Sequence, residues 1–281
     1  MRIIVTGGSS GVGKATAAAL AAAGHNVVIA CRTTSKAQQA AAEMQGDVEV
    51  RQLDLADLTS VRRFADSMEA VDVLINNAGV LGLPLTARTV DGFEAHIGTN
   101  HLGHFALTCL LGNKITNRVI SVGSAMYVLG RIDLDDLNWR TRKYSYWAAY
   151  AQSKLANMLF IDELARRGVR CYASDPGAAD TDITRDSTGL LHWLGEHKFV
   201  TFHMQTPANA ARASIEAVTT NLPSGSYLAP RFNLWGKPKA TNRKDKARDP
   251  VMARRLWELS AELTGCNWPV PDHQIERHAV S

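Results

Sequence analysis

The feature that most constrains the fold of this chain is a glycine-rich turn between a strand pattern and a helix pattern near the N-terminus. Residues 2–5 are apolar, residues 6–13 carry glycines in the spacing Gly-x-x-x-Gly-x-Gly, and residues 14–23 are rich in alanine. Gly7 and Gly11 permit a tight turn with a close backbone approach, and Gly13 lets the helix pack against the strand. The first helical N–H groups are then available to a pyrophosphate, which predicts a dinucleotide site. A glycine turn without a ligand has the same spacing, so other residues must decide.

Strand and helix patterns alternate along the rest of the chain. Runs rich in valine and isoleucine occupy residues 27–31, 48–51, 71–76, 118–122 and 169–174, and helix patterns occupy residues 36–45, 58–69, 93–111 and 147–167. Such alternation predicts a parallel sheet, and right-handed crossovers place helices on both of its faces. We therefore predict an α/β fold with a single Rossmann-type doubly wound parallel sheet. Its ligands are expected beyond the carboxyl ends of the strands.

The composition fits one large globular domain, residues 1–281, because 46% of the residues are hydrophobic. Prolines and alternating charges at 237–249 read as a surface loop, which opens a C-terminal extension of about 237–281 with a helix pattern at 251–263. The formal net charge of +4 comes from scattered basic residues, which argues against nucleic-acid binding.

The cysteines and the hydropathy pattern indicate the compartment. Four cysteines lie far apart at positions 31, 109, 171 and 266, which favours reduced buried thiols over disulfides or metal ligands. No apolar run reaches the ~18 residues that a membrane span needs, and a strand pattern that begins at residue 2 leaves no room for a signal peptide. We expect a cytoplasmic protein without a membrane span.

Tyr150 and Lys154 are four residues apart in a helix pattern, so they share one helix face. An ammonium beside a phenol favours the phenolate, which predicts that the pKa of Tyr150 falls below the usual value of about 10. Such a tyrosine could donate and accept protons near neutral pH. A half-buried tyrosine beside a solvated lysine would give the same spacing.

With these residues the chain resembles the short-chain dehydrogenase/reductase family, which pairs a Thr-Gly-x-x-x-Gly-x-Gly turn with a serine and a Tyr-x-x-x-Lys helix. The resemblance covers nearly the whole chain, because further family motifs follow in the expected order. They are Asp54-Leu55, Asn76-Asn77-Ala78-Gly79, Asn100, Ser124, Pro176-Gly177 and Thr181.

The resemblance implies a catalytic set and a cofactor site. Tyr150 would be the acid/base, Lys154 would bind the nicotinamide ribose and tune Tyr150, and Ser124 would hydrogen-bond the substrate carbonyl. Asn100 would hold a water in the proton relay. Two donors beside the reacting oxygen fit hydride transfer from nicotinamide to a carbonyl carbon. The implied cofactor-binding residues are Gly7, Ser9, Ser10, Gly11, Val12, Arg32, Asp54, Leu55, Asn77, Ala78, Gly79, Tyr150, Lys154, Pro176, Gly177 and Thr181.

Several positions depart from the commonest family pattern. Gly123 stands where a serine often precedes the catalytic one, and Ser121, within the strand pattern, is the less suitable alternative to Ser124. The interval from Ser124 to Tyr150 is about twice the usual length, so residues 125–149 should form an added loop. Asp175 and Asp180 are acidic departures beside Pro176-Gly177 and Thr181.

The long loop, the segment 100–105 and the late segment 255–259 resemble the retinol dehydrogenase and WW-domain oxidoreductase branch of the family. In the segment 100–105, His101 and His104 are three residues apart, a spacing that could suggest zinc. Because no third ligand has suitable spacing, we expect packing or hydrogen bonding and no metal site.

The end of the second strand pattern predicts the cofactor. Arg32 follows that strand, beside two threonines and with no acidic residue nearby, so it can pair with a 2′-phosphate. NADP(H) is therefore expected in preference to NAD(H). An apolar stretch within 182–205, where the family has its substrate lid, points to a lipophilic carbonyl or alcohol, although core packing explains it equally well.

The leading hypothesis is an NADP-dependent oxidoreductase that interconverts an alcohol and an aldehyde or ketone, with a small-molecule substrate. One alternative is a double-bond reductase similar to protochlorophyllide reductase, and another is a dinucleotide-binding sensor or scaffold without turnover. Family members often pair through the helices that bear Asn100 and Tyr150, so a homodimer or homotetramer is expected.

Overall fold

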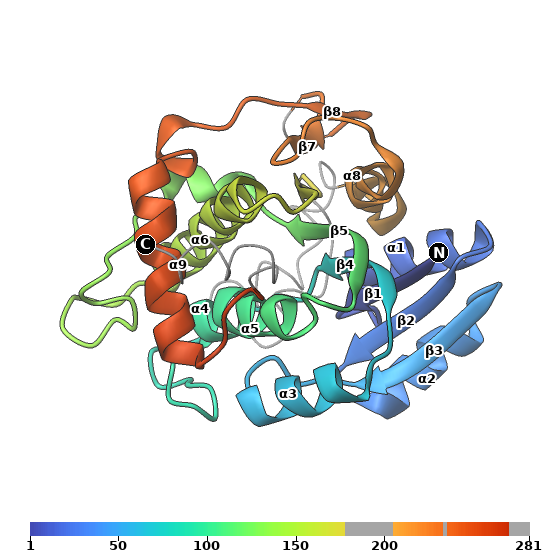
Figure 1. The fold of residues 1–281 in the computed structure, drawn as a ribbon, viewed down its shortest axis with the longest axis horizontal. Helices are drawn as coiled ribbons and strands as arrows, with labels where there is room; N and C mark the ends of the chain where they lie inside the picture. Colours follow the sequence, from blue (N-terminus) through green and yellow to red (C-terminus); the bar gives the residue numbers. More distant parts are fainter. Residues whose placement is uncertain (178–204, 233–234, 270–281) are drawn as a thin grey trace, which may run out of the picture.

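A single mostly parallel sheet organises the molecule (Figure 1). The computed structural model describes residues 1–177, 205–232 and 235–269. The sheet has the order β3-β2-β1-β4-β5-β6-β7-β8, and β8 is antiparallel to β7. The strands are β1 (Arg2–Thr6), β2 (Asn26–Cys31), β3 (Asp47–Gln52), β4 (Val71–Asn76), β5 (Ile115–Val122), β6 (Cys171–Ser174), β7 (Tyr227–Pro230) and β8 (Pro238–Ala240).

Helices cover both faces of the sheet (Figure 1), which confirms the predicted fold class. One face carries α3 (Leu58–Ser67), α5 (Gly103–Leu110), α6 (Tyr146–Arg166) and α9 (Pro250–Thr264), and the other carries α1 (Gly11–Ala22), α2 (Thr34–Ala42) and α8 (Pro207–Thr219). A short helix, α4 (Ala95–Ile97), a π-helical turn, Gly98–Leu102, and 3₁₀ turns at Ala125–Leu129 and Asp245–Ala247 complete the described elements.

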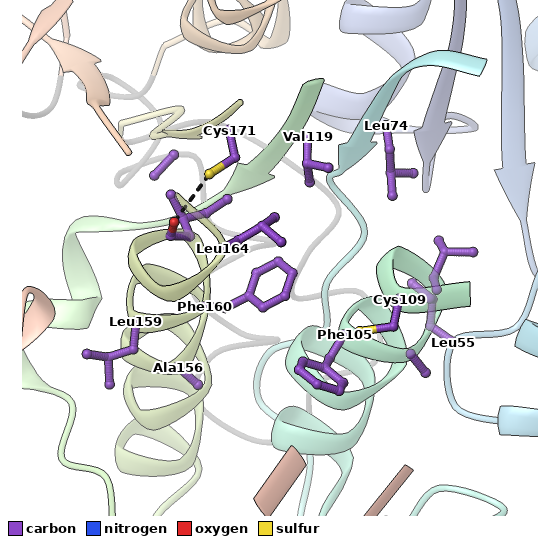
Figure 2. Packing of buried hydrophobic residues seen from close by; sticks show 14 of the residues in the cluster. Leu55, Leu74, Phe105, Cys109, Val119, Ala156, Leu159, Phe160, Leu164 and Cys171 are labelled. Carbon is purple, nitrogen blue, oxygen red and sulfur yellow. Dashed lines mark hydrogen bonds between the residues drawn. The ribbon is translucent and has the colours of Figure 1, made fainter. Parts of the chain in front are cut away.

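Helix α6 is the central element of its layer, and its buried residues run along most of its length. Figure 2 shows Phe160 of α6 and Phe105 of α5 beneath Val119 and Leu74 of the sheet. Trp257 of α9 packs on both rings, with centroids 4.9 Å from Phe105 and 5.7 Å from Phe160. This aromatic packing fixes α6, and with it Tyr150 and Lys154.

The structure differs from the predicted elements in three places. The helix pattern at 93–111 is not one helix, because a π-helical turn, Gly98–Leu102, separates α4 from α5. The predicted surface loop at 237–249 contains β8 and a 3₁₀ turn. The outermost strand, β8, is antiparallel to β7 and adds an edge that the predicted parallel sheet does not include. Most of the expected lid, together with Asp180 and Thr181, lies outside the described residues.

Two glycines explain the break in the helix. A Cβ at Gly98 would lie 2.4 Å from Thr89 Cγ2, and a Cβ at Gly103 would lie 2.3 Å from the Leu55 carbonyl oxygen. Both positions therefore allow a close approach of neighbouring segments. A single π-helical turn of this kind is often found where a helix serves a functional site.

Among the helices that the structure describes, none is both long enough and apolar enough to span a bilayer.

Candidate active site

The glycine turn has the geometry that its spacing predicts. Gly7 and Gly11 have φ values of +67° and +53°, in the left-handed region that favours glycine. A Cβ at Gly13 would lie 2.3 Å from the Gly7 carbonyl oxygen and 2.4 Å from Asn77 Nδ2. The turn therefore depends on the absence of side chains.

Helix α1 begins directly after this turn. Its N-cap residue, Ser10, makes no side-chain capping hydrogen bond, and the first turn contains no acidic residue. Because the first N–H groups of a helix lack partners within the helix, those of α1 can donate hydrogen bonds to an anion such as a phosphate. This cradle fits the pyrophosphate of a dinucleotide.

Thr6 joins the glycine turn to the segment that follows β4. Its Oγ1 accepts hydrogen bonds from the backbone N–H groups of Asn77 at 2.8 Å and Ala78 at 3.0 Å. Asn77 Nδ2 donates to the Thr6 carbonyl oxygen at 2.8 Å. The two predicted cofactor-binding segments thus form one unit at the carboxyl edge of the sheet.

One cavity brings most of the predicted site residues together. Its lining includes the glycine turn, the segment after β4, the end of β5, the start of α6 and the segment after β6. The lining residues are Gly7, Ser9, Ser10, Gly11, Val12, Gly13, Asn77, Ala78, Gly79, Val122, Gly123, Ser124, Tyr150, Lys154, Pro176 and Gly177.

Tyr150 and Lys154 enter this cavity from α6, and Ser124 enters from the end of β5. Ser124 interacts with the Tyr150 side chain and lowers its pKa. Lys154 Nζ donates to the Val122 carbonyl oxygen at 3.1 Å and lies 5.6 Å from the centroid of the Tyr150 ring. Two hydroxyl-bearing residues and a lysine therefore line the same cavity.

The predicted lowering of the Tyr150 pKa is wrong for this structure. Burial raises the pKa of Tyr150, and the hydrogen bond from Ser124 offsets only part of that effect, while Asp175 adds to it. Burial also lowers the pKa of Lys154 to about 8, although Asp175 opposes the change. The sequence pattern places the ammonium near the phenol but gives no measure of how deeply the phenol is buried.

Asn100 lies in the π-helical turn, is fully buried and does not line the cavity. Its Oδ1 accepts from the Val80 N–H at 2.8 Å, and its Nδ2 donates to the Val80 carbonyl oxygen at 3.1 Å and to Ser153 Oγ at 3.0 Å. A Cβ built on Gly79 would lie 3.4 Å from Asn100 Oδ1 and 3.8 Å from Lys154 Nζ. Asn100 thus ties the cavity wall to α6 close to Lys154.

Three predicted cofactor residues lie outside the cavity lining. Arg32 is exposed just beyond β2. Asp54 is half-buried and caps a turn, since its Oδ1 accepts from the Ala56 N–H at 2.9 Å. Leu55 is buried beneath Gly103. All three follow β2 or β3, on the side of the sheet where the adenosine of a dinucleotide is expected.

The two histidines of the segment 100–105 are buried and hydrogen-bonded. His101 Nε2 contacts Ser260 Oγ at 3.0 Å, and His104 Nε2 contacts Thr6 Oγ1 at 2.9 Å. Burial lowers the pKa of His101 to about 4 and that of His104 to about 3. Within the described residues no three metal-ligating side chains come together.

Gly13, Val122 and Gly123 line the cavity but are not among the predicted site residues. A Cβ at Gly123 would lie 2.2 Å from Met158 Cε, the end of a flexible side chain that would have to move aside. The tight packing of α6 against β5 is a tertiary property, and the sequence gives no signal for it.

The added loop before α6 is anchored by a buried polar cluster of Glu94, His96 and Tyr144. Glu94 Oε1 lies 2.6 Å from His96 Nδ1 and accepts from the Tyr144 hydroxyl at 3.1 Å, while Glu94 Oε2 accepts from the Ile97 N–H at 2.9 Å. The His96 ring meets Tyr150 edge-on at 6.3 Å. The loop is thereby attached to the wall behind Tyr150.

A second contact attaches the same loop to α6. Arg142 donates to the Gln152 side-chain oxygen at 2.6 Å, and Gln152 Nε2 donates to the Leu137 carbonyl oxygen at 2.9 Å. Because Gln152 lies between Tyr150 and Lys154 in sequence, the loop supports the helical turn that presents them.

A doubly wound sheet whose glycine turn faces a tyrosine, a lysine and a serine across one cavity defines a nicotinamide-dependent oxidoreductase that acts on an alcohol or a carbonyl. Residues 1–133 match the family model described as short chain dehydrogenase. The chain belongs to this family, in the branch of the retinol dehydrogenases.

Relatives and solved structures support this assignment over most of the chain. Retinol dehydrogenase 13 of Homo sapiens is 42% identical, with 95% of this chain and 85% of that protein covered. Retinol dehydrogenase 12 of Homo sapiens is 40% identical, with 95% and 87% covered. The crystal structure of an uncharacterized protein from Mycobacterium paratuberculosis has a TM-score of 0.82 at 45% identity, with 96% and 95% covered.

A more distant solved structure is a complex with a cofactor. It is a short chain dehydrogenase from Burkholderia cenocepacia in complex with NADP, with a TM-score of 0.61 at 25% identity and coverage of 80% of this chain and 94% of that one.

Proposed function

We propose that this protein is an NADP-dependent oxidoreductase that transfers a hydride between nicotinamide and the carbonyl or alcohol carbon of a lipophilic small molecule. The observation that carries the proposal is the convergence of Ser124, Tyr150 and Lys154 on the cavity that contains the glycine turn. A binding module that only senses a dinucleotide has no need for this set.

The residues of this chain divide the chemistry between them. The N-terminus of α1 and the turn at Gly7 and Gly11 hold the pyrophosphate, while Lys154 binds the ribose. Bound nicotinamide supplies the hydride. Ser124 and Tyr150 donate hydrogen bonds to the substrate oxygen, and Tyr150 passes its proton to that oxygen as negative charge develops there.

The preference for NADP(H) rests on the residues after β2. Arg32 is exposed there, next to Thr33, and no acidic residue occurs within 26–42. A guanidinium can pair with a 2′-phosphate, whereas a carboxylate would favour the ribose 2′-hydroxyl of NAD. The NADP complex of the Burkholderia cenocepacia protein supports this preference by analogy.

The choice of a lipophilic substrate rests on the relatives. Retinol is a long apolar alcohol, and the relatives at about 40% identity are named for its dehydrogenation. Their names also favour alcohol and carbonyl chemistry over the reduction of a ring double bond.

The first experiment measures NADPH oxidation with a panel of apolar aldehydes and ketones that includes retinaldehyde. We expect Tyr150→Phe to lower kcat by at least about 100-fold, as the loss of a general acid does. Tyr146→Phe, one helical turn earlier in α6, is the matched control and should retain turnover. Tight NADPH binding by the unmodified protein without turnover of any panel member would favour the sensor instead.

A second measurement addresses the cofactor. Arg32→Ala should weaken NADPH binding by about tenfold, the loss of one exposed charge-assisted contact, and leave NADH binding unchanged. Equal losses for the two cofactors would contradict the assigned role of Arg32.

A further inference from the structure

Asp175 is a buried acidic residue directly after β6, and the proposed reaction does not use it. Its side chain is 1% exposed. One carboxylate oxygen accepts from the Gly177 N–H at 2.7 Å, and the other accepts from the Tyr227 hydroxyl of β7. The backbone N–H of Ala125 also favours the ionised form of this carboxylate.

These hydrogen bonds join the segments that form one wall of the cavity. Ala125 immediately follows Ser124, Gly177 lines the cavity, and Tyr227 belongs to the neighbouring strand. The wall is further closed by the Gly123 N–H, which donates to the Ser174 carbonyl oxygen at 2.7 Å. The carboxylate of Asp175 is therefore a fixed point for the turns on both sides of Tyr150.

An ionised carboxylate is tolerated in an interior only where donors and a cation compensate for the lost water. Asp175 accepts two hydrogen bonds, and its charge interacts with the Lys154 ammonium. Its charge also acts on Tyr150. One buried carboxylate thus acts on both members of the Tyr-x-x-x-Lys pair.

We propose that Asp175 is a positioning residue that holds Lys154 and Tyr150 in their protonated forms and aligns the Ser124 and Gly177 turns around them. The inference deepens the proposed function and rests on Tyr150 acting there as the acid. It gives Asp175, the acidic residue that departs from the common family pattern before Pro176, a role in setting the protonation of Lys154 and Tyr150.

The direction of the charge effects agrees with this role. Burial lowers the pKa of Lys154 to about 8, and Asp175 opposes that fall. Burial raises the pKa of Tyr150, and Asp175 raises it further. Burial likewise raises the pKa of Asp175 above its ordinary value, and the hydrogen bonds from Tyr227 and Gly177 and the Lys154 ammonium offset only part of that rise.

Other polar groups around the pair come from several elements. His104 of α5 lies near Lys154, His96 of α4 contacts the Tyr150 ring, and Tyr127 packs edge-on against Tyr227 at 6.0 Å. His104 is neutral at physiological pH because burial lowers its pKa to about 3. Within the described residues, Asp175 is the acidic group whose charge acts on both Lys154 and Tyr150.

A protonated Tyr150 is ready to donate, so this arrangement favours carbonyl reduction near neutral pH. Alcohol oxidation needs the deprotonated form, and its rate should rise only towards alkaline pH. Removal of the Asp175 charge should move that rise to lower pH.

The test compares the unmodified protein with Asp175→Asn, which keeps the shape, removes the charge and leaves one acceptor oxygen for the Gly177 N–H. The new amide NH2 group can donate to the Tyr227 hydroxyl, whose direction of hydrogen bonding then reverses. The titration of Lys154 is followed by NMR of isotope-labelled lysine, and the Lys154 signal is assigned by its absence in Lys154→Arg. We expect the Lys154 pKa to fall by about one unit in Asp175→Asn, the usual effect of losing one nearby opposite charge. Asp175→Glu should recover part of the shift.

The matched control is Asp162→Asn, which removes a carboxylate from α6 itself. Asp162 pairs with Arg243 at 2.7 Å, and it lies two turns beyond Lys154. This variant should leave the Lys154 titration unchanged. If Asp175→Asn does not fold, Tyr227→Phe removes one donor from the carboxylate and should give a smaller shift in the same direction.

An unchanged Lys154 titration in folded Asp175→Asn overturns the proposal. The second readout is the pH profile of alcohol oxidation, which should move to lower pH by about the same amount. A Lys154 shift in a protein that turns over no substrate would retain the role of Asp175 and reject the proposed reaction. Normal turnover without a change in the Lys154 pKa would support the proposed reaction and reject the role of Asp175.

Discussion

The glycine turn and the start of α6 line one cavity, yet they are built in different ways. The turn works through backbone groups, and at Gly13 a Cβ would lie 2.3 Å from the Gly7 carbonyl oxygen. The α6 wall works through buried polar side chains, with Tyr150 and Lys154 in the lining and Asn100 behind it. The first wall therefore depends on shape, whereas the second depends on charge and hydrogen bonding.

The difference predicts different sensitivities. A change of pH near neutrality should leave the glycine turn intact, because residues 7–13 themselves carry no titratable side chain. The α6 wall contains carboxyl, imidazole, phenol and ammonium groups whose protonation follows their burial. Substitutions in the glycine turn should therefore affect cofactor binding, whereas substitutions around α6 should affect stability and its pH dependence.

The largest effect is expected for the buried cluster that anchors the added loop. Glu94→Ala removes the acceptor of the His96 side chain, the Tyr144 hydroxyl and the Ile97 N–H. Loss of such a partner should lower the free energy of unfolding by about 3–5 kcal/mol. Chemical denaturation measures this value. Glu43→Ala, which removes a partner of Lys14 that is 66% exposed, should cost less than about 1 kcal/mol. Similar losses of unfolding free energy in Glu94→Ala and Glu43→Ala would contradict the anchoring role of the buried cluster.

A smaller effect is expected in the glycine turn, and it should appear in cofactor binding. Gly13→Ala places a methyl group against the Gly7 carbonyl oxygen, so the turn must shift away from the pyrophosphate position. We expect NADPH affinity to fall by about 100-fold, equivalent to about 2.7 kcal/mol. Calorimetric titration measures it.

Gly24→Ala is the control for that substitution. Gly24 has φ +85°, but a Cβ there would meet no atom within 4 Å. The variant should lose about 1 kcal/mol of stability and keep its NADPH affinity. Unchanged binding in Gly13→Ala would show that the turn can relax around a side chain.

The smallest effect per group is expected from the two buried histidines of the α6 side. Their folded-state pKa values of about 4 and 3 lie below the unfolded value of about 6.5. The unfolded state therefore binds protons more readily, so stability is complete above pH 6.5 and is lost as the pH falls towards the folded-state values. Each histidine should remove about 2 kcal/mol near pH 5.

Unfolding curves measured across this pH range test the assignment. His101→Gln should remove about half of the pH dependence, while His25→Gln, in the turn between α1 and β2, should leave it unchanged. If His101→Gln and His25→Gln changed the pH dependence of stability equally, the buried histidines would not be the cause of the acid sensitivity.

The sequence predicted most of the fold because its signals are local. The alternation of strand and helix patterns and the positive-φ glycines Gly7 and Gly11 need only short windows, and the structure has both. The break at Gly98–Leu102 escaped prediction because its helical periodicity continues through the π-helical turn. The close approach of Thr89 and Leu55 to the two glycines beside it is a tertiary contact that the sequence does not show.

The electrostatics of the candidate site needed the tertiary structure. Asp175 and Tyr227 are 52 residues apart, and Glu94 and Tyr144 are 50 residues apart. No window of sequence shows such pairs. The direction of the Tyr150 pKa shift was wrong for the same reason, since burial depends on how α6 packs and not on the position of Lys154 four residues away.

Helix α9 has a consequence for assembly. It covers the outer side of α5 and α6, where its Trp257 packs on Phe105 and Phe160 and Arg167 lies over the Trp257 ring at 4.1 Å. The resemblance to the family led us to expect self-association through these two helices. Within the described residues, α9 already covers part of the surface of α5 and α6, so a second copy that pairs on this side would meet α9 there.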